Sequence, residues 1–173
     1  MTDLPLPTLD SETTPTAIAA GTTLGTVSLT VSDLAHSRAF YEQALGLRSQ
    51  ELEDGDLALS APGEAALVRL HGDPAAPALD RRATGLFHLA ILLPSRRDLA
   101  QALARLAEAR WPLDGASDHL VSEALYLADP DGNGIELYRD RPRDQWRREP
   151  DGTLTMATLR LDPADLAAEL DGG

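Results

Sequence analysis

The feature that most constrains the fold of this chain is an order of segments that occurs twice: a strand, a helix and then three strands. In the first copy, Val27, Leu29 and Val31 alternate with polar residues, which predicts a half-buried strand. A helix capped by Ser32 or Asp33 follows, with one face made by Ser37, Phe40, Tyr41, Ala44 and Leu45. Gly46 ends this helix, and three short apolar runs separated by turns complete the copy, at 47–52, 57–60 and 65–71.

The second copy starts with Phe87, Leu89, Ile91 and Leu93, which again alternate with other residues. Ser95 caps the next helix with Asp98 as its capping-box partner, and Pro112 follows the end of that helix. Its apolar face consists of Leu99, Ala102, Leu103, Leu106 and Ala107. Three further strands are predicted near 116–121, 124–128 and 134–139, the last two joined by a tight turn at 129–134.

These patterns divide the chain into five segments. We expect an N-terminal arm at 1–22, a first βαβββ module at 24–71, a linker at 72–84, a second module at 85–140 and a C-terminal extension at 141–173. The extension includes a short terminal helix near 159–170, with Asp162 as its cap and Pro163 as its first residue. The predicted fold class is therefore α+β: two tandem βαβββ modules that form a cup-shaped mixed sheet around a central cavity.

Composition narrows the classes of function. The 173-residue chain has a formal net charge of −13, which argues against nucleic acid and anionic membranes as partners. It contains no cysteine, so a metal site would have to use imidazole, carboxylate or water ligands. The start of the chain lacks a basic segment followed by an apolar run, and no apolar stretch has membrane-spanning length, so we expect a cytoplasmic location.

The two modules resemble the vicinal oxygen chelate superfamily, which includes glyoxalase I, fosfomycin- and bleomycin-resistance proteins and extradiol ring-cleaving dioxygenases. The resemblance lies in the opening Val-Ser-Leu-Thr-Val-Ser-Asp-Leu, in Ser-Arg-Ala-Phe-Tyr-Glu-Gln-Ala-Leu-Gly-Leu and in the closing Asp-Pro-Asp-Gly-Asn-Gly-Ile-Glu-Leu. The segments 85–95 and 115–127 are similar, more specifically, to bacterial catechol 2,3-dioxygenase-like proteins. Many of those proteins have four modules and are about twice as long, and this chain, over about 24–166, resembles their N-terminal half.

The resemblance implies a metal between the modules, with ligands from the first and last strand of each. The matching positions are His88 and Glu136 in the second module and Thr26 and Arg69 in the first. Strand alternation supports the first pair, because Phe87, Leu89 and Ile91 on one strand and Ile135 and Leu137 on the other suit the helix-packed face. An oxygenase iron(II) site uses two imidazoles and one carboxylate, whereas Thr26 replaces one imidazole and Arg69 brings a positive charge that could pair with Glu136. The expected metal is iron(II), with manganese or zinc as alternatives.

Two further residues are candidates for catalysis, His119 and Tyr138. His119 could act as an extra metal ligand or as a general acid/base, and its alternative is a structural histidine bonded into a sheet or loop. Tyr126 and Tyr138 have strand packing as their ordinary role, and Tyr138 is retained as a catalytic candidate. Glu123 is interpreted as a solvated or structural carboxylate.

The sequence is compatible with three hypotheses of function. The first is an enzyme that uses a non-haem metal to cleave the ring of a small aromatic diol, as the resemblance implies. The second is a metal-free protein, similar to bleomycin-resistance proteins, that binds a small aromatic or planar ligand in the same cavity. The third is a half-subunit that pairs with a second chain, including as a homodimer, to rebuild a four-module assembly.

Overall fold

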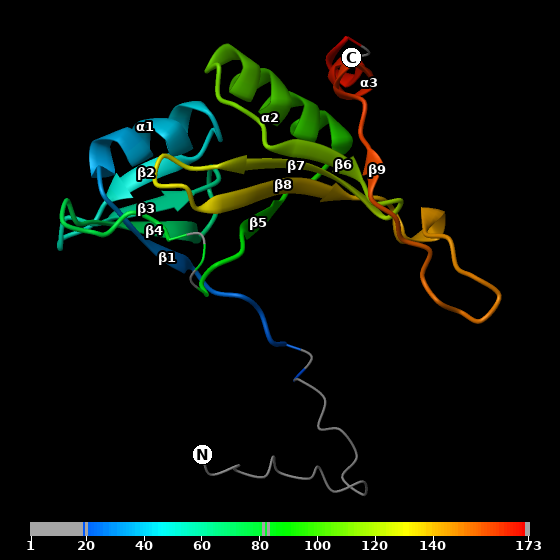
Figure 1. Ribbon diagram of the computed structural model, residues 1–173, viewed down its shortest axis with the longest axis horizontal. Helices are drawn as coiled ribbons and strands as arrows, with labels where there is room; N and C mark the ends of the chain where they lie inside the picture. Colours follow the sequence, from blue (N-terminus) through cyan, green and yellow to red (C-terminus); the bar gives the residue numbers. More distant parts are fainter. Residues whose placement is uncertain (1–18, 20, 81, 83, 172–173) are drawn as a thin grey trace, which may run out of the picture.

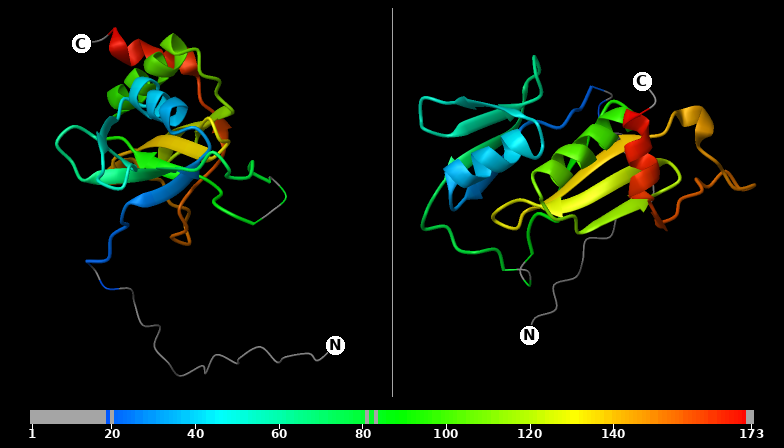
Figure 2. Two further views of the ribbon diagram at one scale, coloured as in Figure 1. Left: turned by 90° about the vertical axis from the view of Figure 1, so that its left-hand side faces the viewer. Right: turned by 90° about the horizontal axis from the view of Figure 1, so that it is seen from above.

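The computed structural model describes residues 19, 21–80, 82 and 84–171, which form two mixed sheets with helices packed on one side (Figure 1). The predicted arm at 1–22 falls almost entirely outside these residues. The sheets have the strand orders β1-β4-β3-β2 and β5-β8-β7-β6-β9. Helices α1 and α2 lie on the same side of the two sheets and leave the opposite faces open (Figure 2). This arrangement confirms the predicted α+β fold of two tandem βαβββ modules with curved sheets.

The first module comprises β1 (Val27–Val31), α1 (Leu34–Gln43), β2 (Arg48–Glu51), β3 (Leu57–Ser60) and β4 (Ala66–Gly72). Strand β1 pairs in parallel with β4, while β3 pairs in antiparallel with both β2 and β4. Asp33 is the helix cap, because its side chain accepts a hydrogen bond from the backbone N–H of His36 at 2.9 Å. The chain leaves the helix through Gly46, whose φ of +80° is unstrained only in glycine.

The second module repeats this order with β5 (Leu89–Leu92), α2 (Arg96–Glu108), β6 (Gly115–Asp118), β7 (Ser122–Ala128) and β8 (Gly134–Asp140). Ser95 caps α2 as predicted, accepting from the backbone N–H of Asp98. Strand β5 pairs in parallel with β8, and β7 pairs in antiparallel with β8 and β6. The segment 129–134 is the predicted turn between β7 and β8.

The hydrophobic core lies between the helices and the sheet faces that they cover. The predicted helix faces are buried, with Phe40, Tyr41, Leu99 and Leu106 at most 4% exposed. Phe87 is an exception to the predicted alternation, because its side chain is 88% exposed rather than packed against α2. Phe87 lies before the first residue of β5. The alternation of side chains between two faces applies only to residues inside a strand.

The turn at 129–134 of the second module is hydrogen-bonded to the first module. Its buried Asp129 accepts hydrogen bonds from the backbone N–H groups of Asp131 and Asn133, and the Tyr41 hydroxyl of α1 donates to the same carboxylate at 3.1 Å. Asp131 accepts from the backbone N–H of Ser32 at 2.9 Å. The turn that leads into β8 is therefore held against the start and middle of α1.

The C-terminal extension runs through η1 (Arg143–Gln145), β9 (Leu159–Arg160), α3 (Pro163–Ala167) and η2 (Ala168–Leu170). Strand β9 joins the edge of the second sheet beside β6, and α3 packs against α2. Asp162 caps α3 and Pro163 is its first residue, as predicted. The helix predicted near 159–170 is shorter than expected, because residues 159 and 160 pair as a strand. Among the described residues, no helix has the length and apolarity needed to cross a membrane.

Candidate metal-binding site on the open face of the second sheet

The parallel pairing of β5 and β8 brings together His88, which immediately precedes β5, and Glu136 of β8. The register of β5 and β8 pairs Leu89 with Ile135 and Ala90 with Glu136. Because Ile135 and Leu137 are buried beneath α2, the Glu136 side chain between them points to the open face. The Nε2 atom of His88 lies 2.9 Å from Oε2 of Glu136, and the two side chains are 28% and 15% exposed. The structure therefore brings together the two residues that the sequence proposed as metal ligands.

The same carboxylate continues into a chain of polar contacts. Tyr126 is the direct cross-strand partner of Glu136, and its hydroxyl lies 2.8 Å from Oε1. The Nε2 atom of His119 lies 2.9 Å from that hydroxyl, and its Nδ1 lies 3.0 Å from the backbone carbonyl oxygen of Ala157. His88 just before β5, Glu136 of β8, Tyr126 of β7 and His119 of the β6–β7 loop thus form one continuous line of proton donors and acceptors.

Tyr126 is the centre of this line. Burial, and then the hydrogen bond to Glu136, raise the pKa of Tyr126 to about 12, so the phenol keeps its proton at neutral pH. A phenol has one proton to donate, whereas Glu136 and a neutral His119 can both accept it. When Tyr126 donates to Glu136, its oxygen can accept from a protonated His119. The hydroxyl can therefore pass a proton between the imidazole and the carboxylate.

The geometry fits two positions of a metal site. Nitrogen and oxygen ligands lie about 2.0–2.2 Å from a bound divalent ion, so two ligands at a right angle are about 3 Å apart. The observed 2.9 Å between His88 and Glu136 is compatible with that separation, and it is equally the length of a direct hydrogen bond between the two groups. Within the described part of the chain, no group of three His, Cys, Asp or Glu side chains is placed to hold a metal. The fit is therefore incomplete, because an iron(II) oxygenase site needs a third protein ligand.

The first-module positions do not complete the site. The Thr26 hydroxyl donates to the backbone carbonyl of Ala66 at 2.8 Å, within its own sheet. Arg69 pairs with Asp54 and with Asp56, the latter at 2.6 Å, so the alternative in which Arg69 pairs with Glu136 is wrong. The hydrogen bond and charge of Asp56 and Asp54 hold the pKa of Arg69 above its ordinary value.

The other sequence candidates have different surroundings. His119 contacts the hydroxyl of Tyr126, which separates it from Glu136, so this arrangement favours an acid/base role over metal ligation. Tyr138 lies on the same face of β8 as Glu136, opposite Ala124, and burial raises its pKa. Glu123 is buried among arginines, so its structural interpretation is supported and its solvated one is wrong.

Tyr126 is the member of this polar line to which the sequence pattern assigned only strand packing. A signal for it was present, since the turn at 129–134 sets the register of β7 and β8 and places Tyr126 directly opposite Glu136. Pairing Ala128 with Gly134 on the two sides of the turn places Tyr126 opposite Glu136 two residues further along. The Ala157 carbonyl had no such signal, because a backbone acceptor in the extension has no residue-type signature.

Comparisons with known proteins agree with this architecture. The family model described as the glyoxalase/bleomycin resistance protein/dioxygenase superfamily matches residues 23–137. A catechol-2,3-dioxygenase of Bacillus subtilis is 44% identical over 155 residues, which cover 89% of this chain and 54% of that protein. The chain therefore spans about half the length of this curated relative.

Solved structures show the same fold. A glyoxalase/dioxygenase from Nostoc punctiforme superposes with a TM-score of 0.61 at 21% identity, covering 75% of this chain and all of that one. A glyoxylase/bleomycin resistance protein/dioxygenase domain from Frankia gives a TM-score of 0.61 at 24% identity, covering 70% and 94%. A fosfomycin resistance protein from Listeria monocytogenes gives 0.55 at 14% identity, covering 72% and 97%. With the family model matching most of its length, this chain belongs to the glyoxalase/bleomycin resistance protein/dioxygenase superfamily.

Proposed function

We propose that this chain carries a catechol 2,3-dioxygenase-like site for metal-dependent ring cleavage of a small aromatic diol. The observation that carries the proposal is the contact between His88 and Glu136, continued through Tyr126 to His119. The 44% identity to the Bacillus subtilis catechol-2,3-dioxygenase supports it. Because that relative is about twice as long, the substrate and activity belong to the proposal.

In this proposal His88 and Glu136 hold a divalent metal, most simply iron(II), with manganese or zinc as alternatives. The metal would supply Lewis-acid polarisation of the diol oxygens. The remaining ligand positions would be filled by the substrate, by water or by a second chain. Since His88 and Glu136 are only partly exposed on an open sheet face, a planar ligand could reach both from the same side.

The chain's own acid/base groups lie beside this position. His119 is the general base, since its Nε2 faces the Tyr126 hydroxyl at 2.9 Å and can receive a diol proton through it. Tyr126 keeps its proton at neutral pH and so acts as a donor toward a substrate oxygen. Tyr138, two residues after Glu136 on the same face, is proposed to line the ligand position as a further catalytic candidate.

Oxygen consumption tests the proposal. The protein is loaded anaerobically with iron(II), free ion is removed, and catechol-dependent oxygen uptake is followed. Wild type should turn over catechol, and Glu136→Gln should lower the rate by at least about 100-fold, because a neutral amide is a poor metal ligand. Glu51→Gln is the matched control on exposed β2 and should keep the wild-type rate. Equal rates for both variants, or no catechol-dependent uptake, would refute the proposal.

A second function, metal-free binding of a planar ligand, is favoured by a specific observation. His88 and Glu136 satisfy one another directly, and the Thr26 hydroxyl is bonded within its own sheet, so these polar groups have partners without a metal. Calorimetric titration of chelator-treated protein with catechol separates the two functions. Binding of undiminished affinity without metal, together with no oxygen uptake after iron loading, would favour the binding protein.

The half-subunit hypothesis concerns what covers the open face. Leu92 of the edge strand β5 is 54% exposed, and Phe87, two residues before that strand and next to His88, is 88% exposed. We propose that a second copy of the chain covers this edge as a homodimer. Sedimentation equilibrium would give a mass near twice 18.5 kDa for the dimer and near 18.5 kDa for a monomer, which would contradict it.

A further inference from the structure

We propose that the C-terminal extension is a working part of the candidate site: it positions His119 and selects the ring nitrogen that faces Tyr126. The inference rests on the proposed function in taking His119 as the acid/base group of that site. The family match ends at residue 137, so the extension lies beyond the part of the chain that the family model covers.

Ala157 holds His119 through both of its backbone polar groups. Its carbonyl oxygen lies 3.0 Å from Nδ1 of the ring, and its N–H donates to the backbone carbonyl of His119 at 3.5 Å. The first contact decides the protonation pattern, because a carbonyl can only accept a hydrogen bond, so Nδ1 must carry the proton. In the neutral ring Nε2 is then an acceptor 2.9 Å from the Tyr126 hydroxyl, so the single phenolic proton is given either to His119 or to Glu136, whose Oε1 is 2.8 Å away. The opposite tautomer would set two lone pairs against each other at Ala157.

The loop that carries His119 is fixed on its other side. Arg141 donates to both oxygens of Asp118, at 2.5 and 2.9 Å, and Asp118 accepts from the backbone N–H of Leu120 at 2.8 Å. Leu120 has a φ of +69°, a left-handed conformation that a branched side chain adopts only when its surroundings impose it. His119 is therefore held between an ion-paired residue and a strained one.

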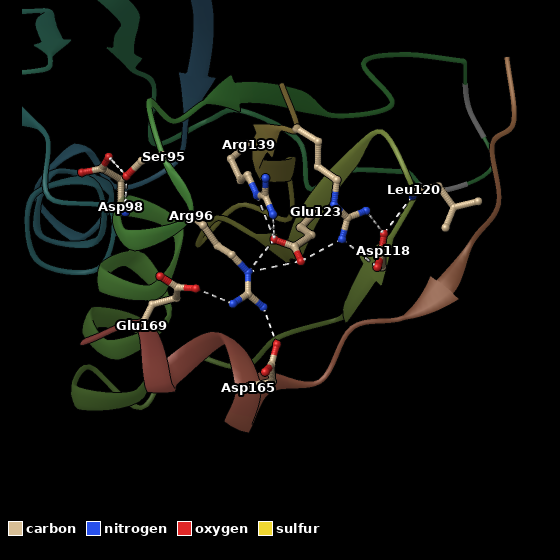
Figure 3. Close-up of polar contacts among 10 residues, drawn as sticks. Ser95, Arg96, Asp98, Asp118, Leu120, Glu123, Arg139, Asp165 and Glu169 are labelled. Carbon is tan, nitrogen blue, oxygen red and sulfur yellow. Dashed lines mark hydrogen bonds and ion pairs between the residues drawn. The ribbon is translucent and has the colours of Figure 1, made fainter. Parts of the chain in front are cut away.

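A charge cluster anchors the extension to the second module (Figure 3). Arg96 of α2 donates to Asp165 at 2.5 Å and to Glu169 at 2.7 Å, both in the terminal helical segment. The same guanidinium contacts the buried Glu123 at 3.0 Å. Arg139 and Arg141 also bind Glu123, at 2.6 and 3.1 Å, so Asp165 and Glu169 supply carboxylates that this arginine-rich group needs.

The residues that bind Arg96, Asp165 and Glu169, are connected to Ala157 through the buried start of the terminal helix and strand β9. Leu161 and Leu166 of the extension are buried at 4% and 0% exposed. Strand β9 pairs Leu159 with Asp118 and Arg160 with Ser117. Leu159 is two residues after Ala157, and Asp118 immediately precedes His119. Their pairing therefore holds this part of the extension against the loop that carries His119. Releasing the anchor should therefore loosen the contact that orients the ring.

The test reads the ring nitrogens of His119 directly by nuclear magnetic resonance of ¹⁵N-histidine-labelled protein, without metal or substrate, at a pH where the ring is neutral. His119 is assigned by loss of its signals in His119→Gln. Wild type should show the proton on Nδ1. In Asp165→Asn/Glu169→Gln the ring should become a mixture of both tautomers, because Arg96 loses both carboxylates from the extension.

The matched control is Glu149→Gln/Asp151→Asn, which makes the same charge change in the extension, at its exposed turn away from Arg96. It should keep the wild-type ring spectrum. A wild-type His119 protonated on Nε2, or an anchor variant with the wild-type tautomer, would overturn the proposal. A protein that fails to cleave catechol but shows this pattern would refute the proposed function and leave the positioning role intact.

Discussion

Tyr41→Phe tests the contact that joins the two modules. The Tyr41 side chain is fully buried in α1, and its hydroxyl donates to the buried carboxylate of Asp129 at 3.1 Å. The substitution keeps the ring, which meets Phe40 edge-on at a centroid distance of 5.1 Å, and removes only the donor. The burial of both groups means that water cannot simply replace the lost hydrogen bond.

The expected loss of unfolding free energy depends on the hydrogen-bond donors that remain around Asp129 in the variant. A hydrogen bond to a charged group contributes about 1.5–3 kcal/mol to the free energy of unfolding. Asp129 retains the backbone N–H groups of Asp131 and Asn133 and the Asn133 side-chain amide as donors, so we expect the lower end, about 1.5–2 kcal/mol. For a chain of this size that corresponds to a fall in Tm of about 3–8 °C.

Differential scanning calorimetry of wild type, Tyr41→Phe and Tyr138→Phe measures this effect. Tyr138 is the matched control, because it is only partly buried on the open face of β8 and should change Tm by no more than about 2 °C. A Tyr41→Phe protein that melts within about 1 °C of wild type would refute the reasoning, since it would mean that the bond between α1 and the 129–134 turn contributes nothing to stability.

Three other substitutions or titrations have defined outcomes. Glu123→Ala should lower the free energy of unfolding by about 3 kcal/mol in urea titrations, because it leaves three partly buried arginines without their buried carboxylate, and a loss below about 1 kcal/mol would contradict this. Gly134→Ala should cost about 1–3 kcal/mol and weaken metal binding, because a Cβ there would lie 2.6 Å from the carbonyl oxygen of Phe87. Gly115→Ala, which meets nothing within 4 Å, should cost less than about 0.5 kcal/mol, and equal costs for the two would argue against a clash. In spectrophotometric titration Tyr126 should ionise near pH 12 in the folded protein and near about 10 when unfolded. Its folded-state pKa is raised, so the associated stability is complete below about pH 10 and is lost as the pH rises toward 12, whereas a native midpoint near 10 would contradict the burial of the phenol.

Much of the fold was predictable because local patterns and packing agree. Alternation marked the buried side of β1, where Leu29 and Val31 are 9% and 0% exposed. The caps Asp33 and Ser95 and the exit at Gly46 are side-chain and backbone requirements that sequence displays directly. Phe87 escaped prediction because alternation applies only inside a strand, and β5 starts two residues later.

The candidate site was predictable only where residue type and strand register coincide. His88, immediately before β5, meets Glu136 because β5 and β8 pair in parallel. The position of His119 depends on a left-handed Leu120 and on a carbonyl 38 residues away, neither of which leaves a pattern in the sequence. The sequence did not show which carboxylate would form an ion pair with Arg69. In the structure Asp54 and Asp56 form that pair, and Glu136 does not.

The central claim is that His88 and Glu136 together hold a divalent metal. The most direct measurement is elemental mass spectrometry of the protein after anaerobic loading with iron(II) and removal of free ion. Wild type should retain close to one metal per chain, and so should the control His71→Ala, whose exposed ring pairs with Asp56 in the first module. His88→Ala and Glu136→Ala should each lose the metal and keep the fold. Full metal content in both variants, or none in wild type, would contradict the account.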